Sequence, residues 1–102
     1  MLGLHEIVSC FEAVAPSGLQ ESYDNCGLLV GEPYTEVGSA LLTLDVTEEV
    51  IDEAIRGNHQ LIIAHHPLIF SGIKKLNGQD EVNRCVIKAL RNNIAIYAIH
   101  TN

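Results

Sequence analysis

Short apolar runs alternate with helical segments along this chain of 102 residues, and this alternation restricts its possible folds more than any other feature. The apolar runs at 39–44, 61–64 and 94–99 have the composition of buried strands. Residues 48–56 and 82–90, which lie between these runs, predict helices. Strands that alternate with helices of about ten residues form a parallel sheet through crossover connections. We therefore predict an α/β fold of three layers, with a mainly parallel sheet and helices on both faces.

Local signals add two elements and mark the ends of a helix. An amphipathic helix is expected at the start of the chain, where apolar residues recur at helical spacing: Leu4, Ile7, Val8, Phe11 and Val14. Residues 24–31 combine turn formers with a short apolar run, which predicts a short strand entered through a tight loop. Thr47 is the expected N-cap of the helix at 48–56, and Gly57 is its expected stop.

The charge balance argues against nucleic acid as a partner. The chain carries 13 acidic and 6 basic residues, for a formal charge of -7. An extended phosphate-binding surface needs clustered lysine and arginine side chains. The basic pair Lys74 and Lys75 is too short for such a surface, so we predict no contact with nucleic acid.

Cysteine usage and hydropathy predict a cytoplasmic protein without a membrane span. The three cysteines are odd in number and form no C-x-x-C pair: Cys10, Cys26 and Cys85. A disulfide scaffold or a cysteine zinc site is therefore not expected. Cys26 has apolar neighbours and no activating base beside it, which disfavours a nucleophile. No apolar run approaches the ~18 residues of a membrane span, and no secretion signal is visible.

Polar residues able to bind metal follow three successive predicted strands. Asp45 follows the first, His65 and His66 follow the second, and His100 lies at the end of the third. In a parallel sheet, ligands gather beyond the carboxyl ends of the strands. We therefore expect these four side chains to share one edge of the sheet.

The adjacent histidines have two interpretations. On a regular strand they would point to opposite faces, so they can serve one site only if the backbone turns, and Pro67 favours such a turn. Two neighbouring imidazoles there could bind two metal ions, one each, if a bridging carboxylate completed the pair. Alternatively, one histidine bonds to the backbone at the strand end and the other is exposed. His5 and His59 are interpreted as surface residues.

Four further residues are candidates with alternatives of their own. His100 is a possible ligand, orienting partner or proton carrier, or a strand-end residue satisfied by solvent. Asp45 either orients a ligand or substrate or helps Thr47 to cap the helix. Asp24 and Asn25 either contact substrate or simply form the turn.

Four segments then resemble, in order, the motifs of the Nif-three-like family, also called GTP cyclohydrolase 1 type 2 homologs. Residues 23–31, YDNCGLLVG, are similar to the family's W-D-N-x-G-L-x-V-G signature. LDVT at 44–47 matches a second stretch, and IIAHHPLIF at 62–70 resembles the metal-binding segment. IHTN at 99–102 looks like the start of an H-T-N-x-D motif. The four motifs, in the order that the family has them, cover nearly the whole chain.

The resemblance implies a dinuclear centre with His65 and His66 as metal ligands. In the family, an aspartate of the H-T-N-x-D motif and a histidine and glutamate near the carboxyl terminus complete the site. This sequence stops two residues before that aspartate, so we interpret residues 1–102 as an amino-terminal α/β metal-binding domain that lacks the carboxyl-terminal half. Two divalent ions per complete subunit are implied, of zinc, iron, manganese, cobalt or nickel. The family also forms ring-shaped homo-oligomers, usually hexamers.

Three functions are compatible with these features. The first is a metal-dependent hydrolase acting on a small nucleotide-like substrate, with His100 as the catalytic proton carrier. The second is a non-catalytic, oligomeric metal-binding protein with an interaction or regulatory role. A nucleotide-binding module without metal is disfavoured because the glycines form neither G-x-G-x-x-G nor a P-loop. Apolar surface left uncovered by a missing half is expected to cause oligomerisation or poor solubility.

Overall fold

A four-stranded sheet forms the centre of the computed structural model, which describes residues 2–14, 27–66, 68 and 74–99. The strands are ordered β2-β6-β5-β4. β4 (Ala40–Thr43), β5 (Leu61–Ala64) and β6 (Ala95–Ala98) are mutually parallel, and β2 (Gly27–Val30) pairs with β6 in the antiparallel sense. The predicted sheet, mainly parallel, is confirmed.

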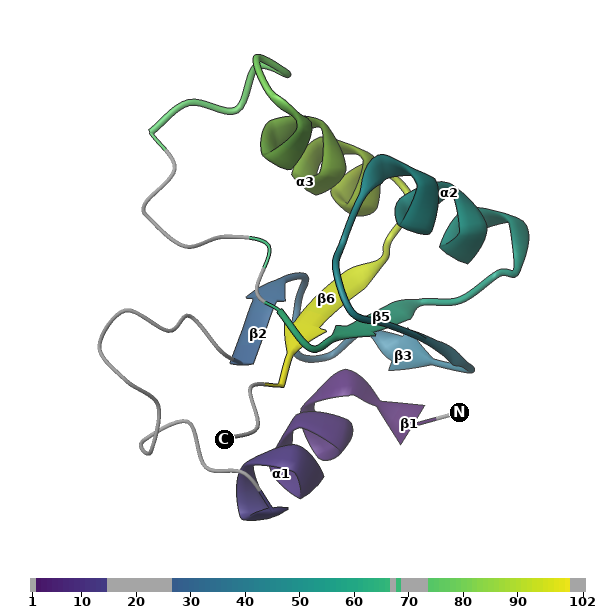
Figure 1. Ribbon diagram of the computed structural model, residues 1–102. Helices are drawn as coiled ribbons and strands as arrows, with labels where there is room; N and C mark the ends of the chain where they lie inside the picture. Colours follow the sequence, from purple (N-terminus) through teal and green to yellow (C-terminus); the bar gives the residue numbers. More distant parts are fainter. Residues whose placement is uncertain (1, 15–26, 67, 69–73, 100–102) are drawn as a thin grey trace.

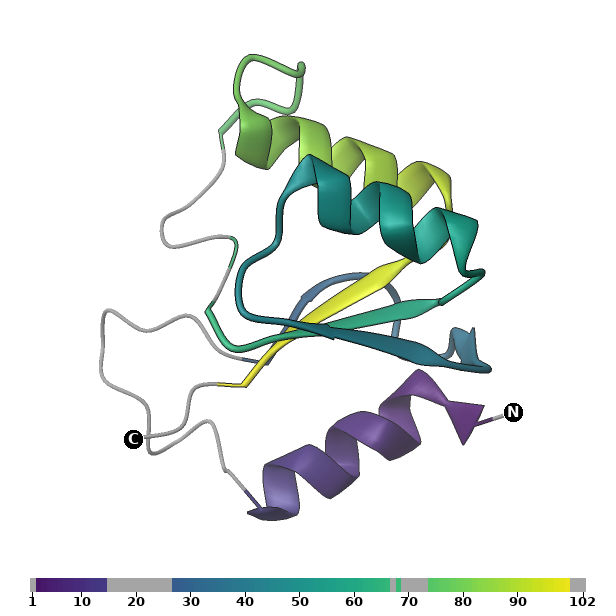
Figure 2. The ribbon, with the colours of Figure 1, turned by 45° about the vertical axis from the view of Figure 1, so that its right-hand side comes forward.

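Helices cover both faces of this sheet (Figures 1 and 2). α2 (Glu48–Arg56) and α3 (Glu81–Arg91) lie on one face, and α1 (Leu4–Val14) lies on the other. A small antiparallel pair, β1 (Leu2–Gly3) with β3 (Glu36–Val37), adjoins the start of α1. The prediction of three layers is therefore confirmed.

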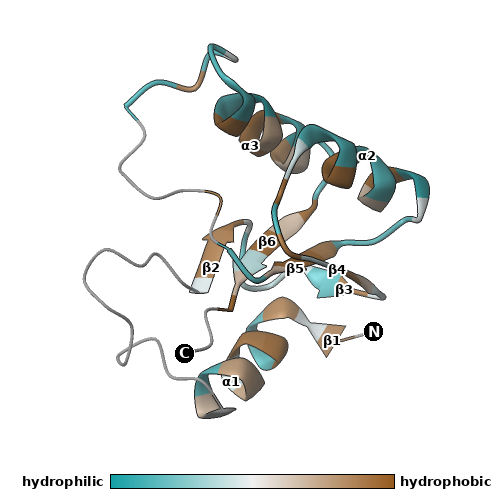
Figure 3. Ribbon diagram, viewed as in Figure 1, coloured by the Kyte–Doolittle hydropathy of each residue, from teal (hydrophilic) through white to brown (hydrophobic). Residues whose placement is uncertain are grey.

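Two apolar clusters join the three layers. On the side of α2 and α3, Ile51 and Cys85 pack with Ile62 and Ile96 of the sheet. On the side of α1, Leu4 belongs to a cluster with buried residues of β5 and β6, among them Leu61, Ala95 and Tyr97. The strands of the central sheet contain many hydrophobic residues, and hydrophobic residues alternate with hydrophilic ones along α2 and α3 (Figure 3). Each helix is thus held by burial of its apolar stripe.

The two β-α-β units are built with the same local signals. Thr47 caps α2 by accepting a hydrogen bond from Val50, as predicted, and Asp80 caps α3 in the same way. After each helix an asparagine adopts positive φ, 55° at Asn58 and 54° at Asn93, before the chain enters the next strand. Asparagine tolerates this left-handed conformation better than most residues. The helix ends are therefore encoded locally.

The prediction that 39–44 is a buried strand is wrong, because β4 lies at the edge of the sheet. Leu42 is 73% exposed and Leu44 is 67% exposed. Leu41, which points the other way, packs on the cluster beneath α2 and α3. On the opposite face, the cluster against α1 includes Leu61 of β5 and Tyr97 of β6 but no residue of β4. An apolar strand therefore lies with one face uncovered.

In α3 the apolar positions at helical spacing differ in burial. Leu90 is exposed, whereas Cys85, Val86 and Ala89 of α3 are buried, as the periodicity predicts. Asn83 is buried as well, and its side-chain oxygen accepts a hydrogen bond from the backbone of Asn77. The hydrogen bond from Asn77 replaces the bonds to water that the Asn83 side-chain oxygen loses on burial.

None of the helices in the described part of the chain is long and apolar enough to cross a membrane.

The fold predicts different costs for two leucine-sized truncations in adjacent strands. Ile62→Ala should lower the free energy of unfolding by roughly 2 to 5 kcal/mol, because Ile62 is fully buried and the change leaves a cavity. Leu42→Ala should change it by less than about 0.5 kcal/mol, because most of that side chain is already in water. Urea unfolding monitored by circular dichroism measures both. Equal losses for the two variants would contradict the arrangement of the sheet.

Candidate metal centre

The candidate site begins where β4 and β5 end, at the carboxyl edge of the parallel strands. The ladder continues beyond the strands: the amide of His65 donates to the carbonyl of Thr43 at 3.1 Å, and that of His66 donates to Leu44 at 2.9 Å. The amide of Ile99, after β6, donates to the carbonyl of Ala64 at 2.8 Å. The backbone of the histidine pair is therefore held against β4, and the residue before the pair also contacts the chain that follows β6.

The chain bends at His65 and His66, so the two side chains do not alternate across the sheet. Their ring centroids lie 4.8 Å apart, and the ring planes are tilted by 59°. His65 is partly buried, whereas the side chain of His66 is 50% exposed. The turn that a shared site requires is present, and it brings two imidazoles together at the surface.

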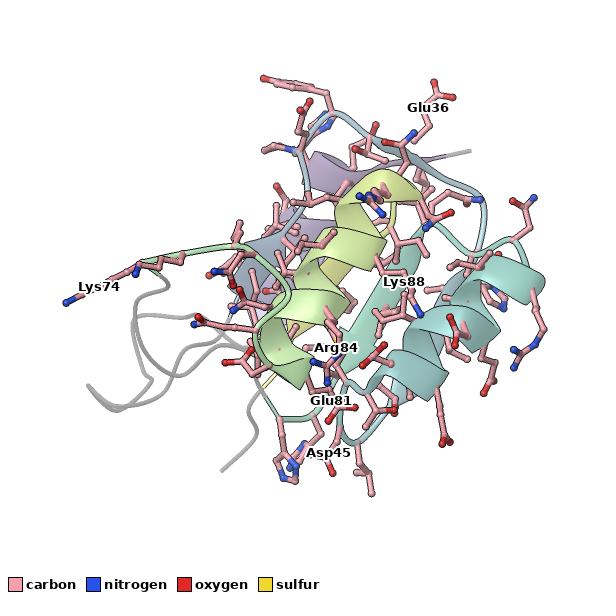
Figure 4. All side chains as sticks on the ribbon, turned by 90° about the horizontal axis from the view of Figure 1, so that it is seen from above. Glu36, Asp45, Lys74, Glu81, Arg84 and Lys88 are labelled. Carbon is pink, nitrogen blue, oxygen red and sulfur yellow. The ribbon has the colours of Figure 1, made fainter. Side chains whose placement is uncertain are left out.

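Asp45 contacts one of the two rings directly. Its Oδ1 lies 2.7 Å from Nδ1 of His66, and the Asp45 side chain is 68% exposed. The hydroxyl of Thr43 donates to the backbone carbonyl of Asp45 at 2.8 Å, and Thr47 caps the following helix. The interpretation of Asp45 as an additional cap is therefore not supported by its contacts. Figure 4 shows Asp45 at the opposite end of the fold from Glu36.

The described residues do not by themselves form a complete metal site. Among them, no group of three or more His, Cys, Asp or Glu side chains is arranged to hold an ion. The other candidates, His100, Asp24 and Asn25, lie outside the described residues. Two adjacent, solvent-accessible imidazoles nevertheless have the donor chemistry that zinc, iron, cobalt or nickel accepts. The histidine pair fits such a metal as two of its ligands.

The other described histidines lie elsewhere. His59 precedes β5, and its Nδ1 lies 2.7 Å from Oγ of Ser39, which precedes β4. This pair is therefore at the amino ends of the strands, the edge opposite to His65 and His66. Nδ1 of His5 lies 3.2 Å from the carbonyl oxygen of Pro33. His5 is exposed as predicted, whereas His59 is partly buried.

The described cysteines offer no activated nucleophile at this edge. Cys85 is fully buried on the face of α3 that packs on the sheet, and burial raises the pKa of its thiol to about 11. Cys10 is exposed on α1, on the other side of the sheet. Cys26 lies outside the described residues.

Sequence reasoning did not pair Asp45 with His66, although the signal was present. The parallel register joins Ala40 to Leu61 and Thr43 to Ala64, a constant separation of 21 positions. Asp45 and His66 have the same separation. The pairing of the two side chains is thus an extension of the strand register, once β4 and β5 are known to be neighbours.

Comparison with known proteins finds one family throughout the chain. The family model described as Duf34/NIF3 (NGG1p interacting factor 3) matches residues 2–102. A "GTP cyclohydrolase 1 type 2 homolog" from Clostridium acetobutylicum is 39% identical over 99% of this chain, which spans 38% of that relative. The protein of the same name from Bacillus subtilis is 40% identical over 95% of this chain, which spans 26% of it. The chain thus corresponds to well under half of each relative.

Solved structures share the fold. The Staphylococcus aureus protein SA1388 superposes with a TM-score of 0.91 at 34% identity, covering 97% of this chain and 32% of its own. A Bacillus cereus protein related to NIF3 has a TM-score of 0.88 at 43% identity, covering 97% of this chain and 27% of its own.

The buried and exposed cysteines should differ in reactivity. With a pKa of about 11, only about one Cys85 thiol in a thousand is ionised near pH 8, so iodoacetamide should modify Cys10 and leave Cys85 intact in the folded chain. Peptide mass mapping after a short reaction measures both sites. In urea the two should react alike. Equal labelling in the folded chain would contradict the burial of Cys85.

Proposed function

The chain belongs to the Duf34/NIF3 family, and we propose that it is a metal-binding domain in which His65 and His66 are ligands of a dinuclear centre. The observation that carries the proposal is the position of the pair: two imidazoles 4.8 Å apart, at the carboxyl edge of parallel strands. Ligand sites concentrate at this edge in α/β folds. The remaining ligands come from outside the described residues.

The geometry supports a role for His65 and His66 as ligands that are already in position before a metal binds. The backbone ladder holds both histidines in place, so little ordering is needed when a metal binds. A divalent metal at this position would supply Lewis-acid activation of water. His100 is proposed as the residue that moves protons near the site. Asp24 and Asn25 remain proposed substrate contacts.

We propose hydrolysis of a small nucleotide-like substrate as the reaction class. The support is the name of the relatives, which are called homologs of a GTP cyclohydrolase, together with the partial metal site. A non-catalytic metal-binding protein with a regulatory role is the alternative. Metal binding without metal-dependent conversion of GTP or related nucleotides would favour the alternative.

We also propose that the protein is cytoplasmic and acts as a ring-shaped homo-oligomer, a hexamer in its complete form. The uncovered apolar edge supports association, because Leu42 of β4 and Leu44, just after that strand, are exposed. Exposed apolar residues on an edge strand favour pairing with another polypeptide. The acidic charge and the absence of paired cysteines among the described residues suit a reducing compartment.

The histidine pair should account for metal binding. After dialysis against zinc, cobalt or nickel and removal of excess ion, elemental analysis should find metal on the chain. His65→Ala with His66→Ala should weaken binding at least about tenfold, because even partners outside the ligand set change affinity by 10- to 100-fold.

The matched control removes two other imidazoles, with His5→Ala and His59→Ala, and should leave metal content unchanged. Circular dichroism establishes that both double variants fold. Equal metal on the wild-type chain and on the His65, His66 variant would contradict the proposed centre.

The exposed edge should drive self-association. Leu42→Lys with Leu44→Lys should lower the sedimentation coefficient toward that of a monomer, because charged side chains oppose pairing at the edge. Leu76→Lys is the control, since Leu76 is 51% exposed and lies outside the sheet. A wild-type chain that sediments as a monomer at all concentrations would contradict association through β4.

A further inference from the structure

We infer that Asp45 is a positioning residue that selects the tautomer of His66 and so makes Nε2 of His66 the metal donor. The inference rests on the proposed metal centre and adds the atom through which one ligand binds. It starts from the 2.7 Å contact between Oδ1 of Asp45 and Nδ1 of His66.

The contact determines where the proton of a neutral ring lies. An ionised carboxylate only accepts hydrogen bonds, so Nδ1 must carry the proton in order to donate to it. A neutral imidazole has one proton on its two nitrogens, which leaves Nε2 with its lone pair free. Only a nitrogen with a free lone pair can bind a metal, so the contact makes Nε2 the available donor.

The backbone holds both members of the pair in place. Thr43 and Leu44 accept hydrogen bonds from the amides of His65 and His66, and the hydroxyl of Thr43 donates to the carbonyl of Asp45. On the other side of Asp45, Val46 is buried and Thr47 caps α2. Asp45 is thus confined between the end of a strand and the start of a helix, although its side chain is in solvent.

A purely stabilising role does not explain the contact. Asp45 and His66 are both largely exposed, and exposed ion pairs add little to folding. The helix cap is already provided by Thr47. Orientation of a ligand requires only that one ring orientation and one tautomer be favoured, and carboxylates bonded to metal-binding histidines commonly have this effect.

The first test reads the tautomer without metal. Long-range proton–nitrogen correlation spectra of the full chain, recorded where imidazole is neutral and assigned with His66→Gln, should show Nδ1 of His66 protonated. Asp45→Ala should shift His66 toward the Nε2-protonated form. Asp45→Asn should retain the wild-type tautomer only in part, because an amide can accept from Nδ1 through its oxygen or donate to Nδ1 through its nitrogen.

Glu49→Gln is the matched control, since it removes one exposed negative charge from the first turn of α2. It should leave the spectrum of His66 unchanged. A wild-type ring protonated mainly at Nε2, or an Asp45→Ala spectrum identical to wild type, overturns the inference. Because Asp45 is exposed, the variants at this position should remain folded, and circular dichroism tests whether they do.

The second test measures affinity for Zn²⁺ by competition with a chromogenic chelator. Asp45→Ala should weaken binding by about 10- to 100-fold, Asp45→Asn by less, and Glu49→Gln not at all. If His65 and His66 are required for binding but Asp45→Ala binds Zn²⁺ as tightly as wild type, the role of Asp45 is wrong and the metal centre stands. If the double histidine variant binds as wild type does, the proposed centre itself is wrong.

Discussion

The parallel pairing of β4 with β5 is the constraint on which the candidate site depends. Its register joins Ala40 to Leu61 and Thr43 to Ala64, and the ladder extends to the amides of His65 and His66. Because side chains opposite one another in a sheet lie on the same face, a carboxylate placed just past one strand meets an imidazole placed just past the next. A shift of one residue in this register would separate them.

The parallel sheet in turn depends on α2 and α3, which carry the chain back across the sheet so that the next strand can run in the same direction. α2 and α3 pack on the same face through Ile51 and Cys85, and ion pairs join their outer surfaces: Arg84 donates to Glu48 at 2.7 Å and Lys88 donates to Asp52 at 2.9 Å. The hydrogen bond from Arg84 lowers the pKa of Glu48. These ion pairs lie near the surface and are partly exposed, so burial of the apolar stripes supplies most of the stability.

The edge strand shows where pattern and environment diverge. The apolar composition of 39–44 predicted burial, and the strand formed as predicted, but its position at the sheet edge leaves Leu42 and Leu44 in solvent. Composition reports how readily a segment forms a strand, whereas burial depends on what packs against it.

Local sequence determined the order of the main helices and strands, the capping of α2 by Thr47, and the position of Asp45, His65 and His66 just after two strands. These features follow from side-chain periodicity and from hydrogen bonds within a few residues. Strand order and the pairing of Asp45 with His66 were decided only by tertiary structure. Residues 21 positions apart meet only when two strands become neighbours, and which strands do so depends on how the helices pack.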